Sequence, residues 1–267
     1  MKKNITKQLG FWSSVFIAVL GVIYLFVLVI YFSTEGFAFP PNQTVQLFGG
    51  IITFLTVPGL LVQFTAIRYA KDWENKILGS LGITFITLFA ATVSINRFVQ
   101  LTVIQQSAQD AASQDLARFL PYATGSVMFA LEMLGWGFFS SLAALSVAPL
   151  FYGSRITTSI RWLFVVYALF SFTSVIGYST ESPISAAAFI AWGPVLSALA
   201  VMLAIYFRKE NQLFLTDDDG IVRSTYKVCN QHCSAMNRNA GEPDRMLGAQ
   251  IPVIQAKNLA RRRNYCQ

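Results

Sequence analysis

The sequence contains little charge, and long stretches of it contain none. Only 12% of its residues are Asp, Glu, Lys or Arg, whereas 54% are hydrophobic. Soluble domains carry roughly a quarter charged residues. A chain of 267 residues cannot hide that much apolar surface in a soluble core. The scarcity of charge therefore excludes an ordinary soluble protein and indicates a protein embedded in a lipid bilayer.

Other absences exclude particular chemistries. The one histidine lies in the polar C-terminal region, so a haem or metal site built from histidines inside the membrane is excluded. No lysine lies within an apolar stretch, which excludes a retinal Schiff base. The motifs G-x-x-x-x-G-K and G-x-S-x-G are missing, so ATP-driven transport by this chain alone and hydrolysis of that type have no support. We expect no cofactor.

What the sequence does contain is six apolar stretches, each long enough to cross a hydrocarbon core of about 30 Å, which takes about 20 residues. All six should be helices, because a span in lipid must satisfy its backbone hydrogen bonds internally and the alternation of a barrel strand is missing. The first stretch is too long for a signal peptide and should remain in the mature protein. The sequence thus predicts an all-α membrane protein with a six-helix transmembrane domain in residues 1–208, its spans at 11–32, 44–67, 77–104, 125–151, 162–177 and 184–207.

The positions of lysine and arginine predict the orientation, because short loops rich in these residues are retained in the cytoplasm. Among lysines and arginines, only Arg118 lies in the loops Ser33 to Gln43, Gln105 to Thr124 and Tyr178 to Pro183. The other loops and the two ends carry Lys2, Lys3, Lys7, Arg68, Lys71, Lys76, Arg155, Arg161, Arg208 and Lys209. Both termini are therefore predicted to be cytoplasmic.

The segment 209–267 differs in composition from the rest and is predicted to be a largely disordered polar cytoplasmic tail. Cys229, His232 and Cys233 are weak candidates for a metal site, because zinc fingers usually need two pairs of ligands. Solvated thiols in a reducing compartment are the favoured interpretation. The sequence pI of about 9.4 is explained by topology and the basic tail, so no nucleic-acid partner is expected.

Two charges lie inside the apolar stretches, where charge is costly and often functional. Arg97 comes about seven residues before the outer end of the third span, and Glu132 about seven after the start of the fourth, so a rise of 1.5 Å per residue places them at similar depth. With Asn96, Gln100 and Trp136 they form a predicted polar cluster in the outer half. The alternatives are a structural ion pair, a site that binds an anion and exchanges a proton, and an arginine that snorkels to the interface.

Small residues and prolines predict how the helices pack and bend. Pro58 and Pro194 mark kinks in the second and sixth spans, and kinks sometimes form sites in transporters. Small faces that allow close helix packing or a homo-oligomer are formed by Gly79, Gly82, Gly137, Ser141, Ala187, Ala191, Gly193 and Ser197.

Two segments carry a resemblance to a known group: NRFVQLTVIQQS, residues 96–107, and ALEMLGWGFFSSLAALSVAPLF, residues 130–151. Over about a fifth of the chain, they resemble uncharacterised bacterial multi-pass membrane proteins. The resemblance implies a bacterial inner-membrane location. It also implies that the similar proteins have the same residues at the positions of Gln100 and Glu132. It also implies an aromatic residue at position 97, where this chain has arginine. It implies no activity.

These observations leave three classes of function open. The favoured one is a small transporter or permease whose polar cluster meets a small-molecule ligand. The alternatives are a non-catalytic membrane subunit that binds other proteins, and an intramembrane enzyme with Glu132 as general acid or base. The lipid bilayer is the one partner common to all three.

Overall fold

The computed structural model describes residues 2–36, 42–70, 76–104, 119 and 125–209. In these ranges the chain is almost entirely helical and contains no strand. Six of the helices are long and apolar enough to cross a membrane. The prediction of an all-α protein with six membrane-spanning helices is therefore confirmed, and the chain has the architecture of a multi-pass membrane protein.

Three spans are regular or nearly regular helices, and three change their winding. The first, second and fifth are α1 (Lys2–Glu35), α2 (Gln43–Ala70) and α7 (Arg155–Ser179). The third joins α3 (Lys76–Val99) to the π-helix η2 (Gln100–Ile104). The fourth runs through α5 (Val127–Glu132), the π-helix η4 (Met133–Phe139), α6 (Ser140–Val147) and the 3₁₀-helix η5 (Ala148–Leu150). The sixth begins with the 3₁₀-helix η6 (Pro183–Ala186), α8 (Ala187–Ile190) and the π-helix η7 (Ala191–Val195), and stays helical to Lys209.

The fifth span begins at Arg155, several residues before the predicted start at 162. A capping box explains the difference. The Thr157 backbone N–H donates to Ser154 Oγ at 3.2 Å, and the Ser154 N–H donates to Thr157 Oγ1 at 2.9 Å. These bonds satisfy backbone groups at the helix start. The helix therefore includes Arg161 and extends beyond the apolar run that hydropathy detects.

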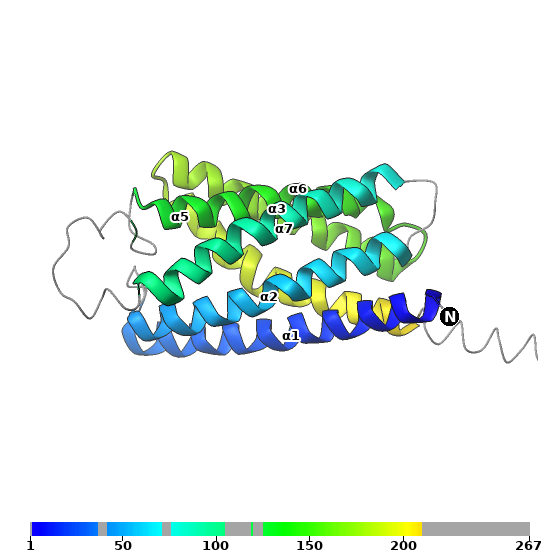
Figure 1. The fold of residues 1–267 in the computed structure, drawn as a ribbon, viewed down its shortest axis with the longest axis horizontal. Coiled ribbons are helices and arrows are strands. Elements are labelled where there is room, and N and C mark those ends of the chain that lie inside the picture. Colours follow the sequence, from blue (N-terminus) through cyan, green and yellow to red (C-terminus); the bar gives the residue numbers. More distant parts are fainter. Residues whose placement is uncertain (1, 37–41, 71–75, 105–118, 120–124, 210–267) are drawn as a thin grey trace, which may run out of the picture. The chain divides into compact units, whose positions relative to one another are not determined.

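The spans pack in chain order, each against the next, and the sixth returns to the first (Figure 1). Glycines make that return close. The Cα of Gly10 faces the ring of Phe207, and that of Gly21 faces Ser197, with no room for a further methyl group at either. Small residues in lipid allow such close approach. The sixth span thereby completes a six-helix bundle.

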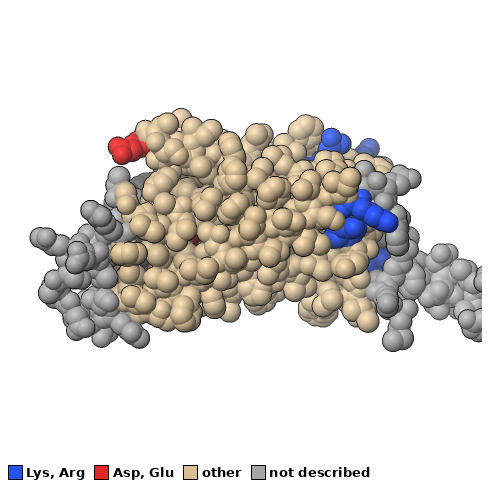
Figure 2. Space-filling model, turned by 45° about the horizontal axis from the view of Figure 1, so that its top comes forward, with Lys and Arg blue, Asp and Glu red and all other residues tan. Residues whose placement is uncertain are grey.

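The two ends of the bundle differ in charge and in packing. Lys and Arg gather at the end that holds the N-terminus, whereas the opposite end of the visible face carries a small acidic patch (Figure 2). The half near the N-terminus is filled by an aromatic core. Phe164 packs against Phe64 at 6.1 Å and against Phe151 at 5.6 Å between ring centroids, and Phe207 is fully buried. The charge pattern agrees with the predicted orientation, which stays a prediction.

Candidate functional site

Arg97 and Glu132 meet inside the bundle. A guanidinium nitrogen of Arg97 forms a salt bridge with Glu132 Oε1, and the two side chains are only 4% and 6% exposed. Among the described residues, they are the only buried charged side chains. Each charge would cost roughly 2.5–3.5 kcal/mol in hydrocarbon on insertion scales. Pairing explains how the fold tolerates both.

Two amides complete the polar cluster. Asn96 Nδ2 donates to the second oxygen of Glu132 at 2.8 Å. Gln100 Oε1 accepts a hydrogen bond from the other terminal nitrogen of Arg97, and Gln100 Nε2 donates to the backbone oxygen of Gln46 at 3.5 Å. The guanidinium is therefore held from two sides, by the fourth span through Glu132 and by the second span through Gln100 and Gln46.

The hydrogen-bond partners of Glu132 in the described chain are Asn96 and Arg97, neither of which is a nucleophile. The described residues also hold no group of three or more His, Cys, Asp or Glu side chains placed to bind a metal. The hypothesis of an intramembrane enzyme therefore gains no support from the contacts of Glu132.

A cavity of about 580 Å³ reaches this cluster. Arg97 and Glu132 lie in its wall, together with stretches of α1, α2 and the sixth span. On α1 the lining residues run from Ile17 to Phe32, about 22 Å of helix at 1.5 Å per residue. The cavity thus extends from the end of the bundle opposite the N-terminus to about its middle. Its volume falls in the range of roughly 300–1,000 Å³ that is common for ligand pockets.

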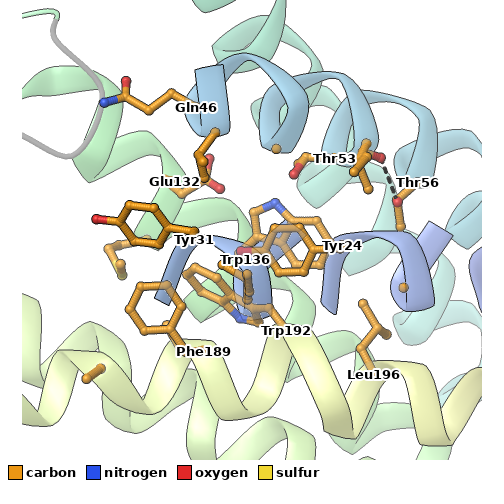
Figure 3. Close-up of a pocket in the computed structure, with 18 of the residues that line it drawn as sticks. Tyr24, Tyr31, Gln46, Thr53, Thr56, Glu132, Trp136, Phe189, Trp192 and Leu196 are labelled. Atoms are coloured by element: carbon orange, nitrogen blue, oxygen red, sulfur yellow. Dashed lines mark hydrogen bonds between the residues drawn. The ribbon is translucent and has the colours of Figure 1, made fainter. Parts of the chain in front are cut away.

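The cavity wall is mainly apolar and aromatic. The rings of Tyr24, Tyr31, Trp136, Phe189 and Trp192 surround the hollow, and Glu132 lies beside them (Figure 3). Aromatic walls with a few placed polar groups are typical of small-molecule sites. This cavity therefore has the composition expected of a binding site for an organic molecule with a polar group.

Trp136, a predicted member of the polar cluster, is 4% exposed and packs edge to face on Phe89, with ring centroids 4.7 Å apart. Its indole nitrogen Nε1 is buried and has no hydrogen-bond partner among the described residues. Asn96 Oδ1 is likewise buried and has no hydrogen-bond partner among the described residues. An unsatisfied buried donor or acceptor costs about 1–3 kcal/mol. These atoms are exceptions to the rule that buried polar groups in proteins are hydrogen-bonded.

Three π-helical segments adjoin the cluster. The segment η2 begins at Gln100 of the cluster, η4 follows Glu132 and contains Trp136, and η7 contains Trp192. π-Helices are rare and frequently occur at functional sites. They arise here in the three spans that bring these side chains to the cavity. Apolar periodicity in the sequence carries no signal for such a local change of winding.

The two prolines predicted to mark kinks behave differently. Pro194 lies inside η7, where the sixth span changes its winding. Pro58 lies inside α2, which continues as one helix from Gln43 to Ala70. Both prolines are exposed on the outside of the bundle. Neither proline lines the cavity. Thr56, two residues before Pro58, and Trp192, two residues before Pro194, both line it.

Several lining residues did not emerge from the sequence. Tyr24 and Tyr31 are seven residues apart on α1 and thus share a face, and Trp192 precedes Gly193 and Pro194 in the sixth span. Thr53 and Thr56 of α2 complete that part of the wall. The signal that could have found Tyr24 and Trp192 is their depth, because aromatic belts place such residues at span ends.

The small residues proposed as oligomer faces pack mainly within the chain. The Cα of Gly82 faces Val147, that of Gly137 faces Val175, and Ser141 and Ala191 are fully buried. Ser141 Oγ also donates to the backbone oxygen of Ala168 at 3.2 Å. These contacts hold the bundle together, and a homo-oligomer formed through them stays a prediction.

The predicted tail beyond Lys209 and the metal candidates Cys229, His232 and Cys233 lie outside the described residues. No match is found for this chain among protein-family models, curated proteins or solved structures. The resemblance to bacterial multi-pass proteins therefore stays a prediction. The functional argument rests on the cavity and on the residues that line it.

Proposed function

We propose that this chain is a secondary transporter that carries a small organic anion together with a proton. The observation that supports the proposal is the cavity of about 580 Å³ with the Arg97–Glu132 ion pair in its wall. A structural ion pair requires no cavity beside it. A pair that exchanges partners with a ligand does require one.

The charges in the site suggest how anion and proton are coupled. While Glu132 is ionised, its carboxylate cancels the charge of Arg97, and it repels a second anion at close range. When Glu132 takes up a proton, its hold on Arg97 weakens, and the guanidinium is available to an oxyanion of the ligand. One anion and one proton then enter together, with no net charge added to a low-dielectric site.

Gln100 acts as the positioning residue in this scheme. It accepts a hydrogen bond from Arg97 and is tied to α2 through the backbone oxygen of Gln46. The guanidinium therefore keeps its place when Glu132 releases it. Asn96, which donates to Glu132 at 2.8 Å, holds the carboxylate in place in the same way.

The rest of the bundle supports access from one side at a time. The cavity approaches the end opposite the N-terminus, whereas the aromatic core around Phe164 fills the other half. With the predicted orientation, the cavity belongs to an outward-facing state. The π-helical segments beside the cluster are the places where the third, fourth and sixth spans can change their winding during the transition.

Uptake into proteoliposomes tests the proposal. Aliphatic and aromatic sulfonates are suitable probes because they remain charged and cross bilayers slowly. With the outside acidic, we expect wild-type protein to accumulate at least one of them and to acidify the lumen at the same time. Glu132→Gln should lose the dependence on the pH gradient. The control Glu35→Gln changes an exposed carboxylate at the end of α1 and should behave like wild type.

Two outcomes would contradict the proposal. Equal gradient-driven uptake by wild type and Glu132→Gln would remove Glu132 from the coupling. Uptake no faster than into protein-free liposomes across the whole series would argue against anion transport.

A further inference from the structure

The two tryptophans of the cavity differ in what their indole N–H groups do. Trp192 Nε1 donates to Ser171 Oγ of α7 at 3.1 Å, so the polar edge of this ring is satisfied by the protein. Trp136 Nε1 is buried and has no partner among the described residues. Both rings line the cavity, with centroids 5.8 Å apart. Trp136 Nε1 is therefore a buried donor in this wall that has no acceptor among the described residues.

Packing fixes the place of that donor. The edge-to-face contact with Phe89 holds the Trp136 ring, and Trp136 follows Glu132 by four residues in the same span. An oxyanion that enters beside Arg97 thus binds in a cavity whose wall also contains Trp136. Buried polar groups in native proteins are normally hydrogen-bonded, so an orphan at a cavity calls for an explanation.

The remainder of the wall indicates what the oxyanion is attached to. Tyr24 and Tyr31 come from α1, and Phe189 and Trp192 from the sixth span, so aromatic rings face the hollow from two sides (Figure 3). Offset-stacked and edge-to-face contacts with such rings favour a planar aromatic body over a saturated one. Arg97 supplies the positive charge for the oxyanion.

We propose that the cavity selects an aromatic oxyanion: a planar ring system packs among these aromatic side chains, and the oxyanion accepts hydrogen bonds from Arg97 and Trp136 Nε1. This inference rests on the proposed function and names the class of its substrate. Trp136 is then a specificity-determining residue, because its N–H donates a hydrogen bond to the ligand and none to the described part of the protein.

Calorimetric titration of the full chain in lipid nanodiscs tests the ligand class with three probes. The first is 2-naphthalenesulfonate. The second, decahydronaphthalene-2-sulfonate, keeps the anion on a saturated ring, and the third, methyl 2-naphthyl sulfone, keeps the ring without the charge. Empty nanodiscs correct for partition into lipid. We expect 2-naphthalenesulfonate to bind at least about tenfold more tightly than either analogue, a difference set by the stacking contacts and the charge-assisted bonds.

A pair of matched variants tests the indole N–H. Trp136→Phe keeps an aromatic ring and removes the donor, and should weaken 2-naphthalenesulfonate binding at least about tenfold, the lower limit for one hydrogen bond to a charged group. Trp162→Phe makes the same change at an exposed tryptophan of α7 that does not line the cavity, and should leave the affinity unchanged. Thermal melts without ligand establish that both variants fold, and Trp136→Phe should not destabilise the protein through any lost hydrogen bond.

Each result decides a part of the inference. Equal affinity for the saturated analogue would overturn the aromatic preference, and equal affinity for the sulfone would overturn the oxyanion. Unchanged binding by folded Trp136→Phe, or no binding of 2-naphthalenesulfonate, would overturn the site. The proposed function fails separately. Selective binding without proton-coupled uptake would refute transport alone, whereas Glu132-dependent uptake of aliphatic sulfonates with no aromatic preference would refute the ligand class alone.

Discussion

Arg97 and Glu132 lie on successive spans, 35 residues apart in the chain, and form a salt bridge that is almost completely shielded from solvent. The pair has a role whichever function the protein performs. It neutralises two charges in a region where either alone would be costly. It also places a carboxylate and a guanidinium side by side in the wall of a cavity.

The first prediction concerns the energetic coupling of this pair. Glu132→Ala leaves Arg97 buried without its counter-charge and should lower the free energy of unfolding by about 3 kcal/mol or more. Arg97→Ala with Glu132→Ala should cost less than Glu132→Ala alone, because the double change removes both charges. Unfolding of purified protein in mild detergent, followed by circular dichroism, measures the cycle.

A control for this cycle is Thr87→Ala. Thr87 is exposed on α3, and its hydroxyl donates to the backbone oxygen of Ile83 in its own helix. Its loss should change stability by less than about 0.5 kcal/mol. Strictly additive effects of the Arg97 and Glu132 changes would show that the two side chains do not depend on each other.

The second prediction compares two helical glycines. A methyl group at Gly177 would meet the backbone of the sixth span, with Ile184 C and Ser185 Cα both at 2.8 Å, and backbone cannot move aside as a flexible side chain can. Gly177→Ala should therefore destabilise the protein by about 1–3 kcal/mol or more.

At Gly49 the nearest atom, in the ring of Tyr24, is 3.8 Å away. Gly49→Ala should be neutral or slightly stabilising, because alanine favours helix by up to about 1 kcal/mol. Thermal melts that ranked the two variants in the opposite order would contradict the close approach of α7 and η6.

The third prediction fixes the orientation. In a background with the native cysteines changed to serine, Thr180→Cys and Tyr152→Cys each place one thiol at opposite ends of the bundle, at exposed positions. A membrane-impermeant maleimide added to intact cells should label Thr180→Cys, and it should label Tyr152→Cys only after permeabilisation. The reason is the concentration of lysine and arginine on the Tyr152 side. The reverse pattern would invert the topology and place the cavity toward the cytoplasm.

The fourth prediction concerns the polar C-terminal region. All six spans lie within residues 1–214, which form a compact unit of their own. A chain that ends at Phe214 should therefore insert, accumulate in membranes and melt within a few degrees of the full chain. Gel filtration and thermal melts of both forms measure this. Loss of the shortened protein from membranes would show that the region from Leu215 onward is needed for folding.

Six spans were predictable because an apolar run of about 20 residues has few alternatives in a chain with so little charge. The similar depth of Arg97 and Glu132 was also readable, since it depends only on a constant rise per residue from each span end. The start of the fifth span was not predictable in this way, because a hydrogen-bonded cap at Ser154 extends the helix beyond the apolar run.

The sequence by itself determined the number of spans, the helical class and the separation of basic from less charged loops, all of which follow from the local cost of charge and of unpaired backbone in hydrocarbon. Only the tertiary structure decided that Tyr24 of α1, Trp136 of η4 and Trp192 of η7 face one cavity. The rotation of each helix about its axis is set by contacts between distant segments, such as Gly21 with Ser197. The unsatisfied N–H of Trp136 likewise has no local signature, because a hydrogen-bond partner is absent only once every neighbouring span is in place.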